Sequence, residues 1–251
     1  MLLSEMKWTE VNQASRTTPI VIPIAALEQH GHHLPVFTDS MLLNEIVQRV
    51  EPTVHDRVIF APMMWLGNSE HHLDFAGTMS ASPRTYLDLL QDMVENFLFH
   101  GFRRIVLLNG HGGNMVPAQQ ALFELRQRRR TQTDMLLLSV TYWSCRDTSG
   151  NESFPFVQTE MGHACEWETS MIMRIRPDLV GPTNALPDVP FGDGFAPAHR
   201  AWVTSDRTEL GHIGSPAQAT AEKGELLLQQ FTRGVVQLLE RIVTWDGQPW
   251  G

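Results

Sequence analysis

The stretch IVIPIAALEQHGHHLPVFTD, residues 20–39, joins an apolar run to a dense polar segment. Residues 20–27 are continuously apolar and rich in β-branched side chains, a pattern typical of a buried strand in a parallel sheet. Pro23 lacks an N–H and favours an edge strand or a bulge. Residues 28–39 then hold one Glu, three His and one Asp. Because a core does not tolerate such groups unpaired, this density indicates a binding site.

Apolar runs and helical patterns alternate along the rest of the chain. The further strands are expected at residues 58–63, 105–108 and 135–140, and the helices at 41–50, 82–99, 117–130, 169–175 and 217–243. Thr38 or Ser40 is expected to cap the first of these helices, and Ser82 with Pro83 begins the second. The alternation predicts βαβ units with a mainly parallel sheet. Because no repeat or linker interrupts it, residues 1–251 are expected to form one domain.

Composition excludes several classes of function. A formal net charge of −9 over 251 residues argues against a nucleic-acid partner, which needs a basic face. No apolar run approaches the roughly 20 residues that span a bilayer, so no membrane partner is expected. Two cysteines cannot make a disulfide framework, and the N-terminus has no signal-peptide pattern. The expected location is the cytoplasm.

Polar clusters follow the predicted strands where the carboxyl ends of a parallel sheet gather ligands. Glu28 and His30, two residues apart, share one side of an extended segment, and Asp39 follows after a short loop. The motif LLNGHGGNM, residues 107–115, places His111 in a glycine-rich turn after the third strand. A further cluster, GHACEWETS, spans residues 162–170. Imidazoles and carboxylates from separate segments suit Zn²⁺, Mn²⁺ or Fe²⁺.

Other interpretations of these motifs fit less well. NGHGGN lacks the ending of a P-loop and the spacing of a dinucleotide fingerprint. The sequence has no G-x-S-x-G nucleophile elbow of a serine hydrolase. A lone histidine at a strand end is most often structural, so His71 and His72 in EHHLDFAGT are expected to line the pocket without binding metal. The residues alone indicate a metal-dependent hydrolase.

Three motifs together, ALEQHGHHLPVFTD, LLNGHGGN and GHACEWETSMIM, resemble the creatininase family over nearly the whole chain. The resemblance implies a three-layer α/β/α sandwich, two divalent metal ions per chain and a homo-oligomer, commonly a hexamer. By position, it implies that Glu28 and His111 bind one metal, that His30 binds the other and that Asp39 bridges them. It also implies that His163 protonates the leaving nitrogen, although an alternative is that His163 only orients a ligand.

One departure from creatininase itself changes the expected second metal site. Creatininase has an aromatic residue and a metal-binding glutamate where this chain has Gly112 and Gly113. Our hypothesis is that Glu166 supplies the missing carboxylate, with Glu168 as the competing choice. The lost aromatic wall also argues against creatinine as the substrate.

The resemblance therefore implies that metal-activated water attacks the carbonyl of a small polar cyclic amide or formamide and breaks its C–N bond. An alternative is hydrolysis of the C–C bond beside a ketone in a cyclic polyol, an inosose-type ring opening. Rival classes are a non-catalytic binding protein on the same scaffold and a metal-dependent isomerase or lyase. Residues predicted to contact the small-molecule substrate are Trp143, Trp65 and His71. Residues 181–214, rich in Pro, Gly and Asp, are expected to form loops that wall the pocket.

Overall fold

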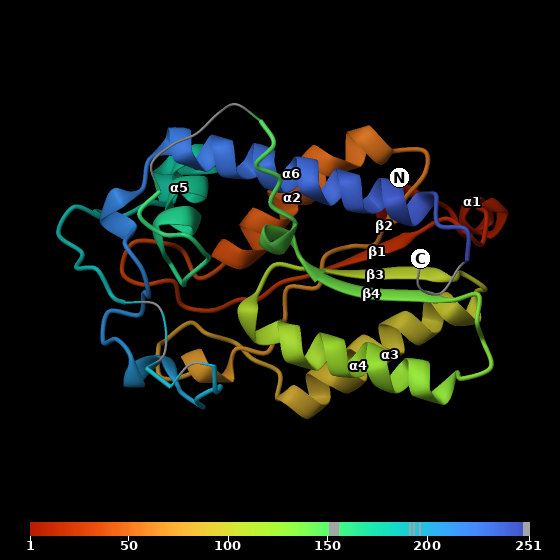
Figure 1. The fold of residues 1–251 in the computed structure, drawn as a ribbon, viewed down its shortest axis with the longest axis horizontal. Coiled ribbons are helices and arrows are strands. Elements are labelled where there is room, and N and C mark those ends of the chain that lie inside the picture. The colour runs from red at the N-terminus through yellow and green to blue at the C-terminus, as the bar shows by residue number, and fades with distance from the viewer. Residues whose placement is uncertain (151–155, 191, 193, 196, 248–251) are drawn as a thin grey trace.

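A parallel four-stranded sheet lies at the centre of the fold, seen in Figure 1 between two layers of helices. The computed structural model describes residues 1–150, 156–190, 192, 194–195 and 197–247. The strands are β1 (Ile20–Ile24), β2 (Ile59–Phe60), β3 (Arg104–Asn109) and β4 (Leu136–Thr141). Their order across the sheet is β2-β1-β3-β4, and every neighbouring pair is parallel. The predicted parallel sheet is thus confirmed.

Helices cover both faces of this sheet. In Figure 1, α3 (Pro83–Phe99) and α4 (Met115–Arg128) lie below it. The helices α2 (Thr38–Val54), α5 (Glu166–Ile175) and α6 (Ala221–Val243) lie above it. The short helix α1 (Trp8–Gln13) precedes β1. Short 3₁₀ helices complete the described elements: η1 (Leu3–Glu5), η2 (Glu70–His72), η3 (Gly112–Asn114), η4 (Tyr142–Cys145), η5 (Pro177–Leu179), η6 (Thr204–Asp206) and η7 (Pro216–Gln218).

Two hydrophobic clusters join these layers. Alternate residues of a strand point to opposite faces, so Ile20 and Ile22 of β1 pack toward α3 and α4, whereas Val21 packs toward α2, α5 and α6. All three side chains are fully buried. The continuous apolar run that predicted β1 therefore reflects apolar cover on both sides, and the three-layer α/β/α architecture is confirmed.

Two local expectations from the sequence have different outcomes. Pro23 lies in a central strand and not at an edge, but Val21 pairs with Phe60 whereas Ile24 bridges Met64, so the neighbouring segment has one extra residue beside the proline, which fits the bulge alternative. The Pro23 carbonyl accepts from the Met64 N–H at 2.9 Å. The predicted cap of the next helix was wrong. Helix α2 begins at Thr38, so Thr38 and Ser40 lie inside its first turn and Phe37 holds the cap position. Ser82, in contrast, caps α3 as predicted, accepting from the Thr85 N–H.

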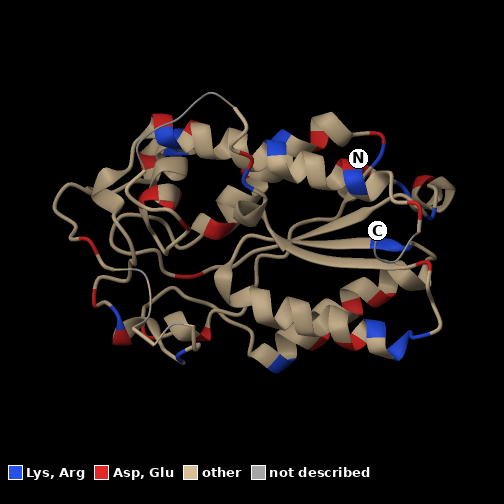
Figure 2. Ribbon diagram, viewed as in Figure 1, with Lys and Arg blue, Asp and Glu red and all other residues tan. Residues whose placement is uncertain are grey.

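Charged residues are dispersed over the fold. Figure 2 shows Lys and Arg interspersed with Asp and Glu along the outer helices, with no single basic face in this view. Among the described residues, no helix combines the length and the apolar character needed to cross a bilayer.

Candidate metal centre

Seven side chains meet beyond the carboxyl ends of the strands. Six of them are at most 4% exposed as residues, and the His163 side chain is 12% exposed. They form the histidine–carboxylate cluster: Glu28, His30, Asp39, His72, His111, His163 and Glu168. The structure thus brings together Glu28, His30, Asp39, His111 and His163, as the sequence predicted. Their roles in metal binding and catalysis stay predictions.

Backbone and side-chain hydrogen bonds at the strand ends hold these residues in place. After β1, the Glu28 N–H donates to the carbonyl of Val36, which folds the polar segment back on itself. After β3, the Asn109 side chain accepts from the His111 N–H at 3.0 Å and donates to Thr141 Oγ1 of β4 at 3.1 Å. The turn that carries His111 is therefore fixed to two adjacent strands.

Asp39 lies between two histidines, with one carboxylate oxygen toward each. Its Oδ1 is 3.2 Å from His30 Nε2, and its Oδ2 is 3.1 Å from His111 Nδ1. His30 Nδ1 lies 3.1 Å from the Glu28 carbonyl and donates to it, which directs Nε2 toward Asp39. Asp39 also sits in the first turn of α2, where the helix dipole favours a negative charge.

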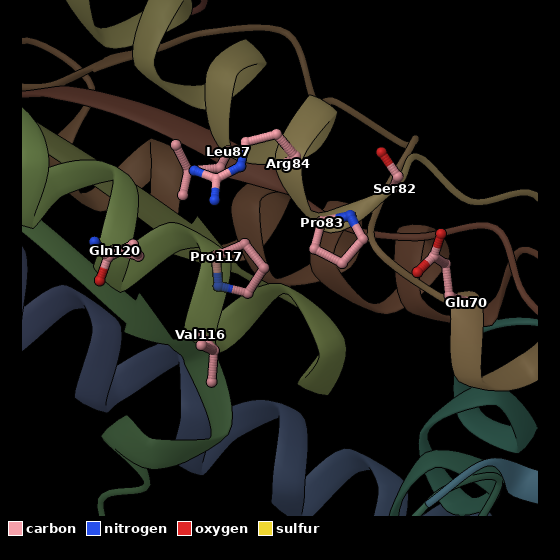
Figure 3. A pocket seen from close by; sticks show the side chains of 8 residues that line it. All are labelled: Glu70, Ser82, Pro83, Arg84, Leu87, Val116, Pro117 and Gln120. Carbon is pink, nitrogen blue, oxygen red and sulfur yellow. The ribbon is translucent and has the colours of Figure 1, made fainter. Parts of the chain in front are cut away.

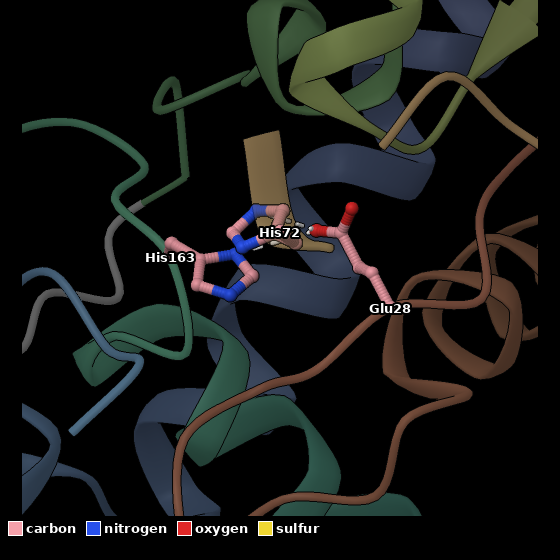
Figure 4. Close-up of side chains that lie close together, drawn as sticks. All are labelled: Glu28, His72 and His163. Atoms are coloured by element: carbon pink, nitrogen blue, oxygen red, sulfur yellow. Dashed lines mark ion pairs between the residues drawn. The ribbon is translucent and has the colours of Figure 1, made fainter. Parts of the chain in front are cut away.

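Glu28 is the other centre of the cluster. Figure 4 shows its carboxylate facing His72 and His163, with His72 Nε2 at 3.3 Å and His163 Nδ1 at 3.5 Å from Oε1. His111 Nε2 is 3.2 Å from Oε2. Three imidazoles from three separate segments therefore surround one buried carboxylate.

The position of Glu166 corrects a prediction. Its Oε1 pairs with Lys223 at 2.5 Å, and its Oε2 accepts from the backbone amides of Val157 and Gln158 at 2.9 and 3.0 Å. Glu166 therefore anchors α5 to α6 and to the preceding loop, and both of its oxygens are occupied. The competing choice, Glu168, has Oε1 3.8 Å from His30 Nε2. Glu168, and not Glu166, is the carboxylate that completes the cluster.

Burial and mutual proximity shift the pKa values of the cluster strongly. Burial raises the pKa of Glu28 from 4.5 to about 7. Burial alone would lower the pKa of His111, but Glu28 and Asp39 outweigh it and raise the pKa to about 9. Burial would likewise raise the pKa of Asp39, yet His30 and His111 hold it below its ordinary value. Burial lowers the pKa of His72 and of His163, so both imidazoles are neutral near pH 7.

The donor set fits a divalent metal ion. Four carboxylate oxygens in the cluster lie buried and make no hydrogen bond within the described residues: Glu28 Oε1, Glu28 Oε2, Asp39 Oδ2 and Glu168 Oε2. Buried anionic oxygens without donors are costly, and a cation satisfies them. Several overlapping sets of three residues place their donor atoms within 4.8 Å of one another, among them Glu28, His30 and Asp39. Nitrogen and oxygen donors of this kind suit Zn²⁺ or Mn²⁺.

Aromatic residues at the rim differ in part from those predicted. His71 stacks on His111 with ring centroids 5.8 Å apart, and Trp202 meets His71 edge-on at 5.3 Å. Trp65 is 41% exposed. Trp143 packs edge-on against Tyr142 and lies against the hydrophobic cluster on the side of the sheet that α2, α5 and α6 cover. Within the described part of the chain, neither tryptophan makes a ring contact with a cluster residue. The sequence offered no signal for Trp202, because it lies in the irregular segment 181–214.

That segment reaches the site as predicted, although residues 191, 193 and 196 lie outside the described residues. Thr204 Oγ1 is 2.7 Å from His72 Nδ1, and the carbonyl of Gly211 accepts from Gln29 at 2.8 Å. A backbone bridge between His163 and Ile213 aligns His163 with the same segment. The residue after His163, Ala164, adopts a left-handed conformation with φ of 47°. This turn directs the His163 ring into the cluster at the cost of local strain.

A separate hollow of about 460 Å³ lies between the first turns of α3 and α4, beside η2. Figure 3 shows Val116, Pro117 and Leu87 on its walls, with Glu70 and Arg84 at its edges. None of its lining residues belongs to the histidine–carboxylate cluster. The side chains that could hold a metal ion therefore lie in the cluster and not in this hollow.

Fold and donor set together define a metal-dependent hydrolase, and the comparisons with known proteins agree. The family profile described as creatinine amidohydrolase matches residues 4–239. The chain belongs to the creatininase family. A creatinine amidohydrolase of known structure superimposes with a TM-score of 0.81 at 26% identity, covering 98% of each chain. Similar structures at 26% identity include creatininase in a Zn-Zn form and in a Mn form.

Relatives in the family carry different activities. The creatinine amidohydrolase of Pseudomonas putida is 28% identical, covering 95% of this chain and 96% of its own. A mycofactocin precursor peptide peptidase of Mycobacterium ulcerans is also 28% identical, covering 100% and 95%. A 3-dehydro-scyllo-inosose hydrolase of Thermotoga maritima is 26% identical, covering 88% and 78%. Membership in the family thus establishes a metal-dependent hydrolase and leaves the substrate open.

The raised pKa values predict how metal-free protein responds to pH. The folded-state pKa of Glu28, about 7, lies above its ordinary 4.5, and that of His111, about 9, lies above 6.5. Each group therefore stabilises the fold below its ordinary pKa, and this contribution is lost as pH rises through the folded value. Below pH 6.5 the lowered pKa values of His72 and His163 act in the opposite sense, because these imidazoles are then protonated only in the unfolded chain. We therefore expect the melting temperature of metal-free protein to fall between about pH 6.5 and pH 9.

Metal binding should show the opposite trend, because a metal ion must displace the same protons. Thermal unfolding in a chelator, and calorimetric titration of Zn²⁺ into stripped protein across this range, measure both effects. His111→Gln is the control variant, since it should reduce this fall. A melting temperature that rises between pH 6.5 and pH 9 in the chelated protein would contradict the assignment.

Proposed function

We propose that the histidine–carboxylate cluster holds two divalent ions and that the protein hydrolyses the C–N bond of a small polar cyclic amide or formamide. The observation that carries the proposal is the position of Asp39, whose Oδ1 faces His30 and whose Oδ2 faces His111. A carboxylate shared in this way suits a bridge between two ions. Glu28 and His111 would complete one site, and His30 and Glu168 the other.

The bound ions would lower the pKa of water and polarise a substrate carbonyl. The protein supplies the proton transfer through His163. Its Nε2 lies 2.8 Å from the Gln29 carbonyl and donates to it, so the lone pair of Nδ1 faces the cluster. A neutral imidazole in this orientation takes a proton from water at Nδ1 and then delivers it to the departing nitrogen. Because an amide nitrogen leaves poorly without a proton, this relay favours C–N cleavage.

Two further points support the substrate class. Two of the three relatives named above are an amidohydrolase and a peptidase, both of which act on C–N bonds. Creatinine itself is not the proposed substrate, because Gly112 supplies no aromatic wall to the site, and a Cβ there would meet no atom within 4 Å. His71 and Trp202 at the rim are the candidate surfaces for a planar substrate.

A second candidate keeps the same residues and cleaves the C–C bond beside a ketone in a cyclic polyol. The Thermotoga maritima relative favours it. In that reaction, His163 would protonate carbon instead of nitrogen. Product analysis of a panel of cyclic amides, formamides and inososes, with metal-reconstituted protein in labelled water, separates the two candidates. Products without oxygen from water would exclude both and favour an isomerase or a lyase.

Asp39→Asn tests the bridged site directly. The substitution keeps the shape and removes the charge, so we expect about two equivalents of metal per wild-type chain and a loss of most of it in the variant. Elemental analysis of untagged protein measures this. Asp88→Asn, at an exposed position of α3, is the control and should keep the wild-type content. Wild-type protein that holds no metal after reconstitution would overturn the proposal.

A further inference from the structure

The carboxamide of Gln29 lies inside the site with its orientation fixed at both ends. Its Oε1 accepts from the Gly31 N–H at 2.8 Å, and its Nε2 donates to the Gly211 carbonyl at 2.8 Å. One hydrogen of Nε2 remains. The only acceptors within reach among the described residues are His72 Nδ1 at 2.9 Å and His163 Nε2 at 3.0 Å. Gln29 is 5% exposed, so water does not readily substitute for either.

The remaining amide hydrogen of Gln29 can be donated to only one of these two nitrogens. His163 Nε2 faces the backbone carbonyl of Gln29 at 2.8 Å, and this contact requires a proton on that nitrogen. A protonated nitrogen cannot accept, so the Gln29 amide donates to His72 Nδ1 instead. His72 therefore has its lone pair on Nδ1, and a neutral imidazole of that form carries its proton on Nε2. Figure 4 shows this edge of the ring turned toward Glu28, 3.3 Å away.

Thr204 is compatible with the same arrangement. Its Oγ1 lies 2.7 Å from His72 Nδ1, and a hydroxyl rotates to donate as readily as to accept. If His72 carried its proton on Nδ1 and donated to Thr204, the Gln29 amide hydrogen would face two protonated nitrogens with no acceptor. A buried donor left in that state is costly.

We propose that Gln29 sets the proton positions of the site, so that His72 presents an N–H to Glu28 and is a positioning residue and not a metal ligand. The backbone carbonyl of Gln29, which accepts from His163 Nε2, leaves the lone pair of His163 Nδ1 facing the cluster. Although Glu28, His72 and His163 have donor atoms close enough to hold an ion, this assignment removes His72 from that set. The metal-ligand part of the inference rests on the proposed function, whereas the proton positions do not.

Nuclear magnetic resonance of the full chain, stripped of metal and labelled at the histidine ring nitrogens, reads the tautomer directly. The His72 signals are assigned by their loss in His72→Gln. We expect the proton on Nε2 in wild type and in Thr204→Val. In Gln29→Glu we expect it to move to Nδ1, because a carboxylate accepts where the amide donated. Wild-type His72 with its proton on Nδ1, or a proton that moves in Thr204→Val, would overturn the inference.

Metal affinity gives the second measurement. His72→Gln keeps an N–H near the position of Nε2, so we expect its Zn²⁺ affinity to stay within about three-fold of wild type. Removal of a metal ligand, or of a residue that positions a ligand, lowers the affinity by roughly 10–100-fold or more. His72→Leu removes the N–H and should show that larger loss. Equal losses in both variants would make His72 a ligand. Protein that binds no metal but carries the Nε2 proton would refute the proposed function alone.

Discussion

Alanine in place of Glu166 is expected to destabilise the fold by about 3–5 kcal/mol while leaving the metal content unchanged. Glu166 is fully buried, and its partner Lys223 is only 8% exposed. Removal of the carboxylate leaves the buried Lys223 ammonium without an anion among the residues that the structure describes, with the Gln218 carbonyl and the Phe156 ring as its remaining contacts. It also strips the backbone amides of Val157 and Gln158 of their acceptor. An unpaired buried charge is among the most destabilising changes that one substitution can make.

Glu168→Ala is the matched variant, two residues along the same helix. It removes an oxygen that faces His30 and another that has no donor, so the metal-free fold should lose little stability. The metal content should fall. Urea unfolding of chelated protein and elemental analysis of reconstituted protein separate the two variants. If Glu166→Ala loses metal with unchanged stability, Glu166 is a ligand after all and the geometric assignment fails.

This pair of glutamates also shows where prediction from the sequence stops. Successive residues of an α-helix turn by about 100°, so Glu166 and Glu168 point to nearly opposite sides of α5. The motif EWETS indicates that a carboxylate is available, but it does not indicate which side of the helix faces the cluster. That depends on how α5 packs against α2 and α6, a tertiary property that no local pattern records.

The part of the site that was predictable follows from the parallel sheet. Glu28 and His30 come directly after β1, and His111 directly after β3, so the rule that ligands gather at the carboxyl ends of strands places them together. His72 and Trp202 lie in long irregular segments. These segments have no hydrophobic periodicity from which the positions of the two side chains could be predicted. His71 and His72 are neighbours in the chain, yet only the structure distinguishes the ring beside Glu28 from the ring beside Trp202.

Alanine at Gly113 is expected to distort the metal centre, whereas alanine at Gly112 should be tolerated. A Cβ at Gly113 would lie 2.2 Å from the Asn68 carbonyl oxygen and 2.5 Å from His111 Nε2. Both of these atoms belong to the contact that orients His111, since Nε2 donates to the Asn68 carbonyl at 3.0 Å. The methyl group therefore displaces the imidazole. A shift of about 1 Å at a reacting centre costs roughly 100-fold in rate, and we expect a comparable loss together with weaker metal binding.

Gly112 provides the control because a Cβ there meets no atom within 4 Å. Both glycines lie in η3, and neither has a positive φ, so the two variants differ in available space and not in backbone strain. Metal content and melting temperature of the two alanine variants measure the difference. The same clash predicts that Gly113→Glu does not recreate the ligand found in creatininase, because the backbone of Asn68 already occupies the space next to residue 113. Full metal content in Gly113→Ala would show that Asn68 and His111 can move apart without loss, and it would contradict this prediction.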